Sequence, residues 1–553
     1  MTLELRGIPA APGSAIGAPW IHQPSDSDAA VRSTLPTAAT AAAAELRTMA
    51  AGLRADGRDD EAEILEAQAL MAGDPELLGS ATSAMDGGTD VVAAVNDAGE
   101  AVAATFESLE DEVLSARAAD VRDVCARIVR HLVGGEAPRL ERRSVVVAAD
   151  LPPSVTVELD RALLAGIALE GGSRTSHAAI LARGLGIPAV VGVPDLVRHA
   201  RAAAELAVDG DAGRLVIDPD DRVRAEMASH AAAHGDRRVA DAAFAGRLLA
   251  TADGHRVTCA ANIGEPGDAA AAFAAGAEAI GLFRTEFAFA GRASAPTEDE
   301  QAAAYASVFE AARGAQVVVR LADIGGDKPL PYVPIPTETN PFLGVRAIRL
   351  AASHPDLFPT QVRAILVASA RTGRQASIMA PMVADAGDAA IVRGLVRDAL
   401  AAVPDAPTPR VGIMVEVPSA VLLADELARE VDFMSIGTND LTAYLLAADR
   451  TNAALAERQD PCHPAVLRAV ARVVEAAAAA GDCAVAVCGE MAGDPVGACL
   501  LVGLGVDELS MEPAAFGAVK RAVAGRRLDE LRALGTAAQA APSAAAVRAL
   551  MAA

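Results

Sequence analysis

The sequence predicts an α/β protein in which a helical subdomain and a short α/β section precede a (β/α)8 barrel. Two observations indicate this fold class. From Gly254 onward, short apolar runs of strand type are mostly separated by segments of helix length, the alternation that a barrel of parallel strands requires. From about residue 26 to residue 140, Ala, Leu, Asp and Glu recur at helical spacing with few strand formers between them. The length of 553 residues allows about two to four domains at ~150 residues each.

The segments before the barrel differ in composition. Residues 1–24 are rich in Gly and Pro and contain short apolar runs, which predict strands and turns. An α/β section begins at Ser144, with a helix expected after His177 and strands expected at 145–149, 165–169, 189–191 and 215–217. Residues 220–250 are charged and rich in Ala, and we expect a linker helix there.

The barrel prediction depends on eight apolar runs. They lie at 257–263, 279–283, 317–321, 376–383, 411–416, 432–436, 484–488 and 506–511. Eight such units in about 300 residues favour a closed barrel. An open, doubly wound sheet is the alternative fold.

The net charge limits the possible partners. With 48 basic and 73 acidic residues the chain carries a formal charge of −25, which argues against nucleic acid and anionic membranes as main partners. Of this charge, −14 falls between Glu45 and Asp123, where 19 acidic residues face 5 arginines and no lysine. A basic protein partner and a plainly solvated acidic surface both remain open.

Cysteine and proline usage indicates the compartment. The six cysteines form no C-x-x-C pair, so a reducing cytoplasm is the simplest interpretation. The longest uncharged run, from Gly7 to Ser25, contains four prolines, which exclude a continuous membrane-spanning helix. We therefore expect a cytoplasmic protein with no membrane insertion and no signal peptide.

A histidine lies in a glycine-rich loop between an expected strand and an expected helix. The segment from Glu170 to Arg183 reads EGGSRTSHAAILAR and places His177 in the first helical turn. Free backbone N–H groups and the positive end of the helix dipole favour a phosphoryl group there, and a neutral imidazole is a nucleophile. A single His at a helix start is more often a cap or a packed residue, but the Gly-Gly-x-x-Thr-Ser-His context favours a phosphoryl acceptor.

Polar and reactive side chains recur where the expected barrel strands end. In chain order they are Arg284, Arg320, Asp323, Lys328, Arg346, Glu416, Asn439, Asp440, Arg450 and Cys488. Since the carboxyl ends of barrel strands converge on one mouth, we expect these side chains to lie together. A single arginine or carboxylate is more often a surface ion pair or a cap, but a run of them at successive strand ends favours a binding site.

The residue types at this mouth indicate a substrate. Arginine binds phosphate and carboxylate oxygens bidentately, and Glu416 and Asp440 offer the hard oxygen ligands that Mg²⁺ prefers. Cys488 could donate a proton to a carbon centre. A phosphate-bearing carboxylic acid that passes its phosphoryl group to His177 meets these demands, and phosphoenolpyruvate is such a compound.

These residues belong to motifs that closely resemble the enzyme I family of the bacterial phosphoenolpyruvate-dependent sugar phosphotransferase system. The resemblance spans nearly the whole chain. It includes GIPAAPG from Gly7, DLPPS from Asp150, the His177 loop and, in the second half of the chain, GLFRTEF, DIGGDK, NPFLG, GTNDL and CGEMAGD.

The resemblance implies roles for single residues. His177 would be the phosphorylated histidine, and Thr156 would hydrogen-bond its imidazole. Glu416 and Asp440 would hold Mg²⁺, and Cys488 would protonate the enolate to give pyruvate. Phosphoenolpyruvate would be bound by Arg284, Arg320, Arg346, Asn439 and Arg450, with help from Lys328.

The resemblance also implies a domain organisation. Residues 1–24 and 141–220 would form a swivelling phosphohistidine domain, into which a helical subdomain, 25–140, is inserted. The helical subdomain would dock the small histidine-containing phosphocarrier protein, HPr. Residues 221–250 would be a linker helix and candidate hinge, and 251–553 would form the phosphoenolpyruvate-binding barrel of a homodimer.

Two departures from the family are modest. Ser173 and Arg174 occupy loop positions at which relatives vary, and Gln68 stands in an expected docking helix where many members carry His. Gln68 therefore bears on carrier specificity rather than on catalysis.

Four alternatives start from the same residues. Pyruvate phosphate dikinase and phosphoenolpyruvate synthase would need a nucleotide-binding domain before the His177 loop, and a nitrogen-related enzyme I would need a sensory domain before Gly7. A non-catalytic phosphocarrier or scaffold would predict loss of a mouth residue, and none of those named above is lost. A phosphoenolpyruvate-binding barrel without transfer would lack the His177 loop.

Overall fold

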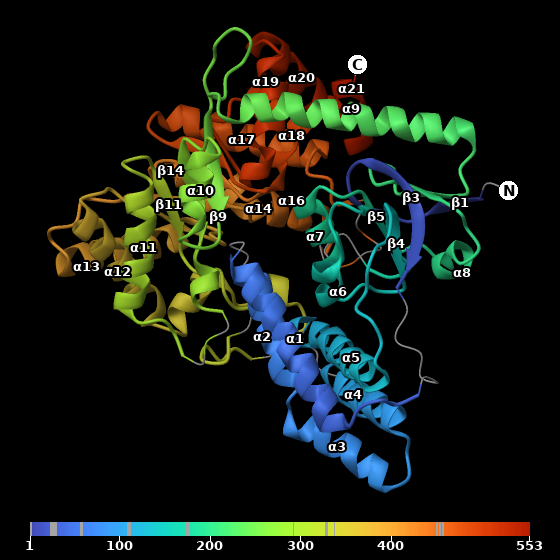
Figure 1. Cartoon of the computed structure of the whole chain (residues 1–553). Helices are drawn as coiled ribbons and strands as arrows, with labels where there is room; N and C mark the ends of the chain where they lie inside the picture. Colours follow the sequence, from blue (N-terminus) through green and yellow to red (C-terminus); the bar gives the residue numbers. More distant parts are fainter. Residues whose placement is uncertain are drawn as a thin grey trace. The chain divides into compact units, whose positions relative to one another are not determined.

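The computed structural model describes residues 3–22, 30–55, 59–107, 112–172, 177–290, 292, 294–326, 330–336, 338–449, 452, 455 and 458–552. The chain divides into two compact units, Met1–Asp236 and Arg237–Ala553, each of which is described by itself (Figure 1).

The first unit contains an eight-stranded sheet in the order β1-β8-β7-β3-β4-β5-β6-β2. Its strands are β1 (Leu3–Arg6), β2 (Ile8–Ala11), β3 (Ser14–Ile21), β4 (Ser144–Ala148), β5 (Leu164–Leu169), β6 (Ala189–Val191), β7 (Leu206–Asp209) and β8 (Arg214–Ile217). The central strands β3, β4, β5 and β6 pair in parallel, and the others join antiparallel. Because β4 and β5 are buried along their whole length, they read as continuous apolar runs.

The sequence predictions for this sheet are largely confirmed. The four expected strands correspond to β4, β5, β6 and β8, and residues 1–24 supply β1, β2 and β3. Strand β7 was missed. The accompanying helices are α6 (Pro153–Glu158), α7 (His177–Leu185), α8 (Leu196–Ala200) and α9 (Asp221–Ala245), the last of which continues into the second unit.

A helical bundle lies between β3 and β4 in the chain. It consists of α1 (Leu35–Ala55), α2 (Asp59–Met71), α3 (Pro75–Asp86), α4 (Val91–Glu107) and α5 (Glu112–Val133). Helix α1 packs on α2 and α5, and α4 packs on α3 and α5, around a core built mainly of Ala, Leu and Val. Asp74 caps α3 by accepting the N–H groups of Glu76 and Leu77, and Pro75 occupies the first helical turn, where no N–H is needed.

Gln68 lies inside this bundle. Its side chain is fully buried, and its amide donates to Asp120 Oδ1 at 2.9 Å and to Asp123 Oδ2 at 3.3 Å. Gln68, which stands where many family members carry His, therefore makes an internal contact between α2 and α5. It is not part of the exposed face of α2.

The second unit is a closed barrel of parallel strands in the order β10-β11-β12-β13-β14-β15-β16-β9. The strands are β9 (Thr258–Ile263), β10 (Ala279–Arg284), β11 (Val317–Arg320), β12 (Ser377–Ala380), β13 (Arg410–Val415), β14 (Phe433–Ile436), β15 (Ala484–Val487) and β16 (Glu508–Met511). Each matches one of the eight apolar runs, so the closed barrel is confirmed and the open sheet is excluded.

Helices surround the barrel strands. They are α10 (Asp268–Ala274), α11 (Glu298–Ala311), α12 (Leu357–Thr372), α13 (Ala386–Ala402), α14 (Pro418–Leu422), α15 (Ala424–Leu427), α16 (Thr438–Leu446), α17 (Pro464–Ala480), α18 (Pro495–Leu504), α19 (Phe516–Ala524), α20 (Leu528–Ala540) and α21 (Ala544–Ala552). One large apolar core lies between the strands and these helices, and a smaller one lies inside the barrel. Across the described ranges of the chain, we find no helix with the length and apolar character needed to span a membrane.

Candidate active site

The carboxyl-terminal mouth of the barrel collects most of the predicted site residues. Arg284 and Arg320 end β10 and β11, while Glu416 and Cys488 directly follow β13 and β15. Asn439 and Asp440 lie in the first turn of α16, and Arg346 immediately precedes a 3₁₀ turn between β11 and β12. Because all eight strands are parallel, these ends open on the same side.

Arg346 is held by a buried carboxylate. Its side chain is 1% exposed, and Asp323 accepts from Nε at 3.0 Å and from an Nη at 2.6 Å. The same Nη lies 3.6 Å from Asp440 Oδ2. Burial alone would lower the pKa of Arg346, but Asp323, Asp440 and Glu416 raise it above its ordinary value. The guanidinium is therefore a fixed positive charge.

Arg320 is held in a similar way by Glu286. The two side chains approach to 2.9 Å, and Asp323 lies 3.8 Å from the guanidinium. Glu286 also accepts the backbone N–H of Asp323 at 2.6 Å. Glu286 thus orients Arg320 directly. It also holds the backbone of Asp323, which orients Arg346.

Glu416 and Asp440 form a pair of close carboxylates. Glu416 is buried and accepts the backbone N–H of Met382 at 2.7 Å. Burial and the nearby charges of Asp440 and Asp323 raise the pKa of Glu416, against the opposing effect of Arg320 and Arg346. Two carboxylates whose charges oppose each other in this way fit a divalent cation that prefers oxygen ligands.

Cys488 faces the barrel interior below these charges. It is 3% exposed, and it packs with an apolar layer that includes Leu282, Val318, Met379 and Met414. Burial raises the pKa of its thiol to about 11, although Ser435, Arg320 and Arg284 act to lower it. The thiol therefore keeps its proton at neutral pH, as a proton donor must.

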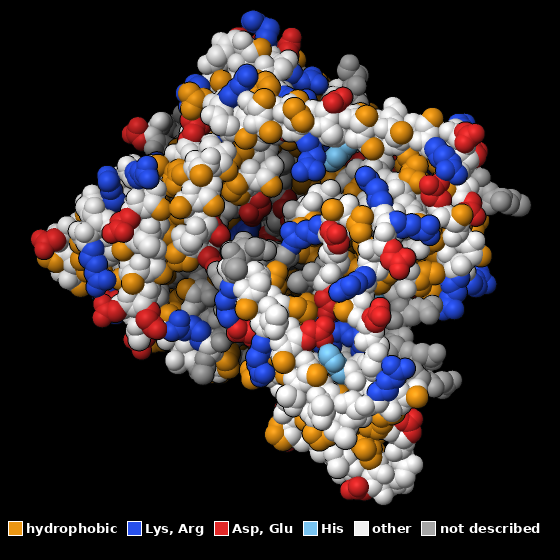
Figure 2. All heavy atoms as spheres, viewed as in Figure 1, with side chains coloured by type: hydrophobic (Ala, Val, Ile, Leu, Met, Phe, Trp, Pro, Cys, Tyr) orange, Lys and Arg blue, Asp and Glu red, His pale blue; other side chains and the backbone are white. Residues whose placement is uncertain are grey.

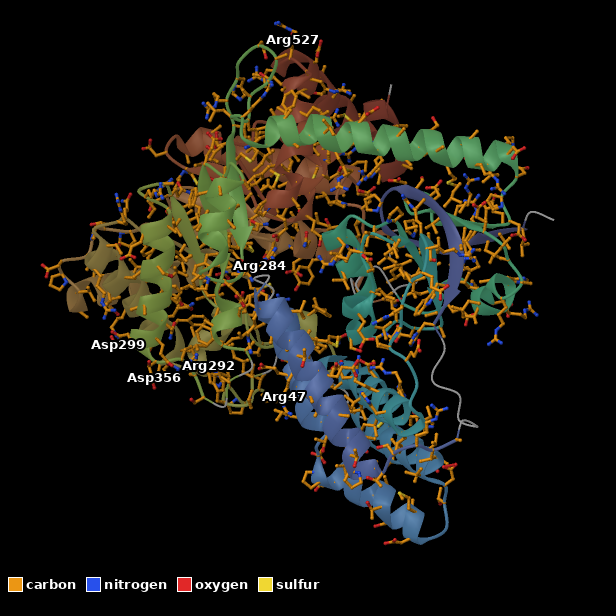
Figure 3. The ribbon with its side chains drawn as sticks, viewed as in Figure 1. Arg47, Arg284, Arg292, Asp299, Asp356 and Arg527 are labelled. Carbon is orange, nitrogen blue, oxygen red and sulfur yellow. The ribbon has the colours of Figure 1, made fainter. Side chains whose placement is uncertain are left out.

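Two predicted residues lie at the rim of the mouth. Arg284, labelled in Figure 3, is about one third exposed and contacts Glu512 Oε1 at 3.3 Å. Asn439 is exposed, and its Oδ1 accepts the backbone N–H of Glu490 at 2.9 Å. Both side chains can reach an incoming ligand.

Four predicted residues lie wholly or partly outside the described residues. Lys328 and Arg450 lie outside the described residues, as do the side chains of Thr156 and His177. The backbone of His177 begins α7, where the sequence predicts a helix start, and Thr156 lies in α6.

The sequence assigned no role to three residues at the mouth, although it placed Asp323 there. Glu286 and Asp323 orient the arginines, and Tyr444 donates its hydroxyl hydrogen to Phe342 O at 2.5 Å. Tyr444 thereby joins the segment after GTNDL to the NPFLG motif. The signal for Glu286 and Asp323 was their place in the GLFRTEF and DIGGDK motifs beside Arg284 and Arg320.

The chain matches known proteins along most of its length. Residues 240–528 match the PEP-binding domain of PEP-utilising enzymes, residues 140–213 their mobile domain and residues 6–117 their N-terminal domain. The chain is similar to the phosphoenolpyruvate-protein phosphotransferase of Bacillus subtilis strain 168, with 40% identity over 92% of both chains. The enzyme of the same name from Bacillus sp. strain S is 42% identical over 82% of this chain and 79% of its own length, and that from Listeria innocua is 38% identical over 96% and 95%.

The chain belongs to the phosphoenolpyruvate-protein phosphotransferase family. It is therefore an enzyme of phosphoryl transfer that uses phosphoenolpyruvate, and the family expected from its motifs is confirmed. The mouth residues fall within the PEP-binding match, whereas Thr156 and His177 fall within the mobile-domain match.

Proposed function

We propose that this member of the phosphoenolpyruvate-protein phosphotransferase family transfers the phosphoryl group to its own His177 and then to HPr, releasing pyruvate. The observation that carries the proposal is the barrel mouth. There, two oriented guanidinium groups, Arg320 and Arg346, lie with a carboxylate pair and a protonated thiol.

The arginines account for substrate binding. Arg320 and Arg346 have fixed positions before any ligand arrives, so little ordering remains for binding to achieve. The rim residues Arg284 and Asn439 would complete the site, together with Arg450 and Lys328. Forked N–H donors match the oxygens of both the phosphate and the carboxylate of phosphoenolpyruvate.

Glu416 and Asp440 would hold Mg²⁺. This assignment rests on their hard oxygen atoms and on the raised pKa of Glu416, which burial and the nearby charge of Asp440 both cause. When bound, the ion would neutralise negative charge on the transferred group. The match to the PEP-binding domain of PEP-utilising enzymes supports a negatively charged, phosphate-bearing substrate next to this ion.

The chemical steps use residues of both units. The imidazole of His177, oriented by Thr156, would form a P–N bond as the P–O bond of phosphoenolpyruvate breaks. The enolate that leaves would take the thiol proton of Cys488 at its carbon, which forms the methyl group of pyruvate. The arginines would stabilise charge that develops on the phosphoryl oxygens.

The domain roles follow the sequence expectation. We assign phosphohistidine chemistry to residues 1–24 and 141–220, HPr docking to 25–140, a linker to 221–250, and substrate binding with homodimer formation to 251–553. Exposed acidic residues on α3 and at the start of α4 (Figure 2) support docking of a basic partner. The six free cysteines support a cytoplasmic location.

Labelled phosphoenolpyruvate provides the direct test. Incubation with Mg²⁺ and the labelled compound should leave acid-labile, base-stable label on the protein, and addition of HPr should move that label to the carrier. His177→Ala should abolish the label, whereas His199→Ala, a control on α8 in the same unit, should retain it. Label that persists in His177→Ala would disprove the assignment.

A further inference from the structure

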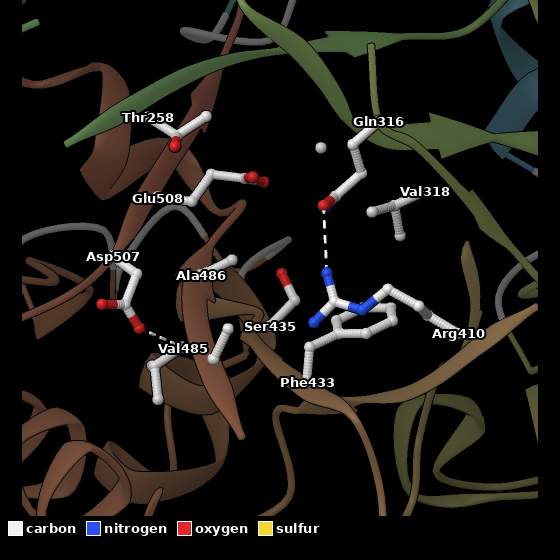
Figure 4. A pocket seen from close by; sticks show the side chains of 12 residues that line it. Thr258, Gln316, Val318, Arg410, Phe433, Ser435, Val485, Ala486, Asp507 and Glu508 are labelled. Atoms are coloured by element: carbon white, nitrogen blue, oxygen red, sulfur yellow. Dashed lines mark hydrogen bonds between the residues drawn. The ribbon is translucent and has the colours of Figure 1, made fainter. Parts of the chain in front are cut away.

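The amino-terminal floor of the barrel contains a polar cavity, opposite the mouth (Figure 4). Its volume is about 130 Å³, enough for ~four water molecules at their liquid volume. Thr258, Phe433, Ala484 and Glu508, the first residues of β9, β14, β15 and β16, contribute to its wall. None of the mouth residues that bind or orient substrate in the proposed function lines it.

Small side chains create this cavity. The interior of a (β/α)8 barrel is normally filled by bulky branched residues, but here Ser435, Ala484 and Ala486 line the wall. Gly281 is required, since a Cβ at this position would lie 2.5 Å from both Glu508 Oε1 and Ser510 Oγ. The barrel interior is therefore open along β14, β15 and β16.

Two buried polar atoms face this space with no hydrogen bond of normal geometry to the described residues. Glu508 is 8% exposed and Ser435 is 1% exposed, and within the described residues neither Glu508 Oε1 nor Ser435 Oγ has a hydrogen-bond partner of normal geometry. Buried polar groups in native proteins are satisfied by protein or by ordered water. A polar cavity of this size with several hydrogen-bonding groups suits ordered water.

Ser435 also lies next to Cys488. Ser435 pairs with Ala486 in the β14–β15 ladder, one layer below Cys488, whose N–H donates to Ile436 O at 3.1 Å. The thiol sulfur lies 3.8 Å from the same carbonyl oxygen. Ser435 thus separates the floor cavity from the thiol, and its hydroxyl acts to lower the pKa of that thiol.

We propose that the floor cavity is a proton path, in which water held by Glu508 and Ser435 returns a proton to Cys488 after each turnover. This inference rests on the proposed role of Cys488 as the proton donor. The thiol is 3% exposed and meets very little solvent directly, so an internal route to it would speed its reprotonation.

Each proton that moves along this path has a named donor and a named acceptor. The S–H bond of Cys488 breaks as the C–H bond of pyruvate forms, and the thiolate then takes the hydroxyl proton of Ser435. Ser435 regains a proton from cavity water, and the water regains one from the Glu508 carboxyl group. Solvent reprotonates Glu508 through the floor, where Gln316 and Arg410 are half-buried and Asp507 is exposed.

The other charged groups around Glu508 are already engaged. Arg410 donates to Gln316 Oε1 at 3.1 Å and to Asp432 O at 3.0 Å, and Asp507 accepts the backbone N–H of Val485 at 2.8 Å. Burial raises the pKa of Glu508 to about 7, which Arg410 opposes and Asp507 reinforces. The carboxyl group can therefore both hold and release a proton near neutral pH.

A comparison of the first turnover with later turnovers tests the path. Cys488 starts in its protonated form, so Glu508→Gln should form the first equivalent of pyruvate within about twofold of the wild-type rate, measured by rapid quench. Later turnovers, with HPr in excess, should be at least about tenfold slower and should show a larger solvent deuterium isotope effect. Ser435→Ala should behave in the same way.

The control is Glu278→Gln, which removes a floor carboxylate that pairs with Arg256 and accepts the N–H of Cys259 outside the cavity. It should leave both phases unchanged. Later turnovers at the wild-type rate in Glu508→Gln, or an equal slowing of first and later turnovers, would overturn the proton path. Cys488→Ala separates the two hypotheses, since a normal first turnover in that variant would refute the thiol donor itself.

Discussion

Asp323 binds Arg346 through both carboxylate oxygens, at 3.0 Å and 2.6 Å, in a pair whose side chains are only 2% and 1% exposed. The geometry leaves the guanidinium no freedom to turn, and the N–H of Asp323 is in turn anchored by Glu286. The arginine that we propose to bind substrate is thus positioned by residues that need not touch the substrate themselves.

Asp323→Asn should impair both stability and substrate binding. In the amide an NH2 donor replaces one of the two oxygens that accept from Arg346, and the buried positive charge is no longer balanced. Loss of one partner in a buried pair costs about 3 kcal/mol. Since Arg346 would no longer be held in place, we expect the KM for phosphoenolpyruvate to rise about tenfold or more. Calorimetric unfolding and steady-state kinetics measure the two effects.

Asp425→Asn is the matched control for this change. Asp425 pairs bidentately with Arg472, but both side chains are more than one third exposed. Its loss should destabilise the protein far less than the loss of Asp323, because exposed ion pairs are screened by solvent, and should leave the KM unchanged. Equal losses of stability in the two variants would show that burial does not set the strength of the Asp323–Arg346 pair.

Cys488→Ala should separate binding from turnover. The thiol packs within the barrel and contacts no described charged group directly, so phosphoenolpyruvate should still bind, whereas pyruvate formation should fall about 10²-fold to 10⁴-fold. Titration calorimetry and a coupled pyruvate assay measure the two quantities. Cys499→Ala, which removes another buried thiol from α18, should leave turnover unchanged, and normal turnover in Cys488→Ala would remove the acid role.

The mouth could be predicted from the sequence, but its internal pairing could not. Parallel strands bring Arg284, Arg320, Glu416 and Cys488 to one side whatever their exact register, so their positions in the motifs were sufficient. The contact of Glu286 with Arg320 depends on how β10 and β11 align, with Arg284 opposite Arg320, and that alignment is a property of the closed barrel.

The floor cavity was hidden for a similar reason. Glu508 lay within an apolar run that was correctly predicted as a strand. Its burial becomes meaningful only when Gly281, Ser435 and Ala486, from three other strands, leave space beside it. Strand β7 was missed because Leu206–Asp209 is a four-residue run in an Ala-rich stretch, too short for a clear alternation.

The free energy of unfolding should depend on pH because Glu508 titrates at a different pH in the folded and unfolded protein. Burial raises its pKa from 4.5 to about 7 in the folded protein, so the folded protein keeps a proton that the unfolded chain has lost. Stability from this group is present below pH ~4.5 and is lost as the pH rises through about 7, to a limit of about 3 kcal/mol. The side chain of Glu508→Gln stays neutral at every pH. Calorimetry should therefore find that the stability of this variant rises relative to the wild type between pH 5 and pH 8. A stability difference that does not change with pH would refute a buried acid at this position.

Transfer to HPr should slow as salt concentration rises. Asp74, Glu76, Asp86 and Asp90 are exposed on α3 and the adjoining turns, within the segment that carries more than half of the net charge. An attractive field between exposed charges is screened over about 10 Å at 0.1 M salt, and we expect about a tenfold loss of association rate between low and high salt. Phosphorylation of His177 by phosphoenolpyruvate serves as the internal reference. A transfer rate that does not depend on salt would show that the acidic segment is a solvated surface with no part in attracting the carrier.

Leu70 should be part of the carrier-docking surface. It lies in the last turn of α2 with 71% of its surface exposed, close in sequence to the acidic residues Asp74 and Glu76. An apolar centre with a charged rim is the usual anatomy of a protein interface. Leu70→Ser should lower the rate of transfer to HPr about tenfold, because buried apolar area is lost only in the complex, and should leave self-phosphorylation unchanged. Ile391→Ser, at another exposed apolar residue on the barrel helix α13, is the matched control, and equal transfer rates in the two variants would place the docking surface elsewhere.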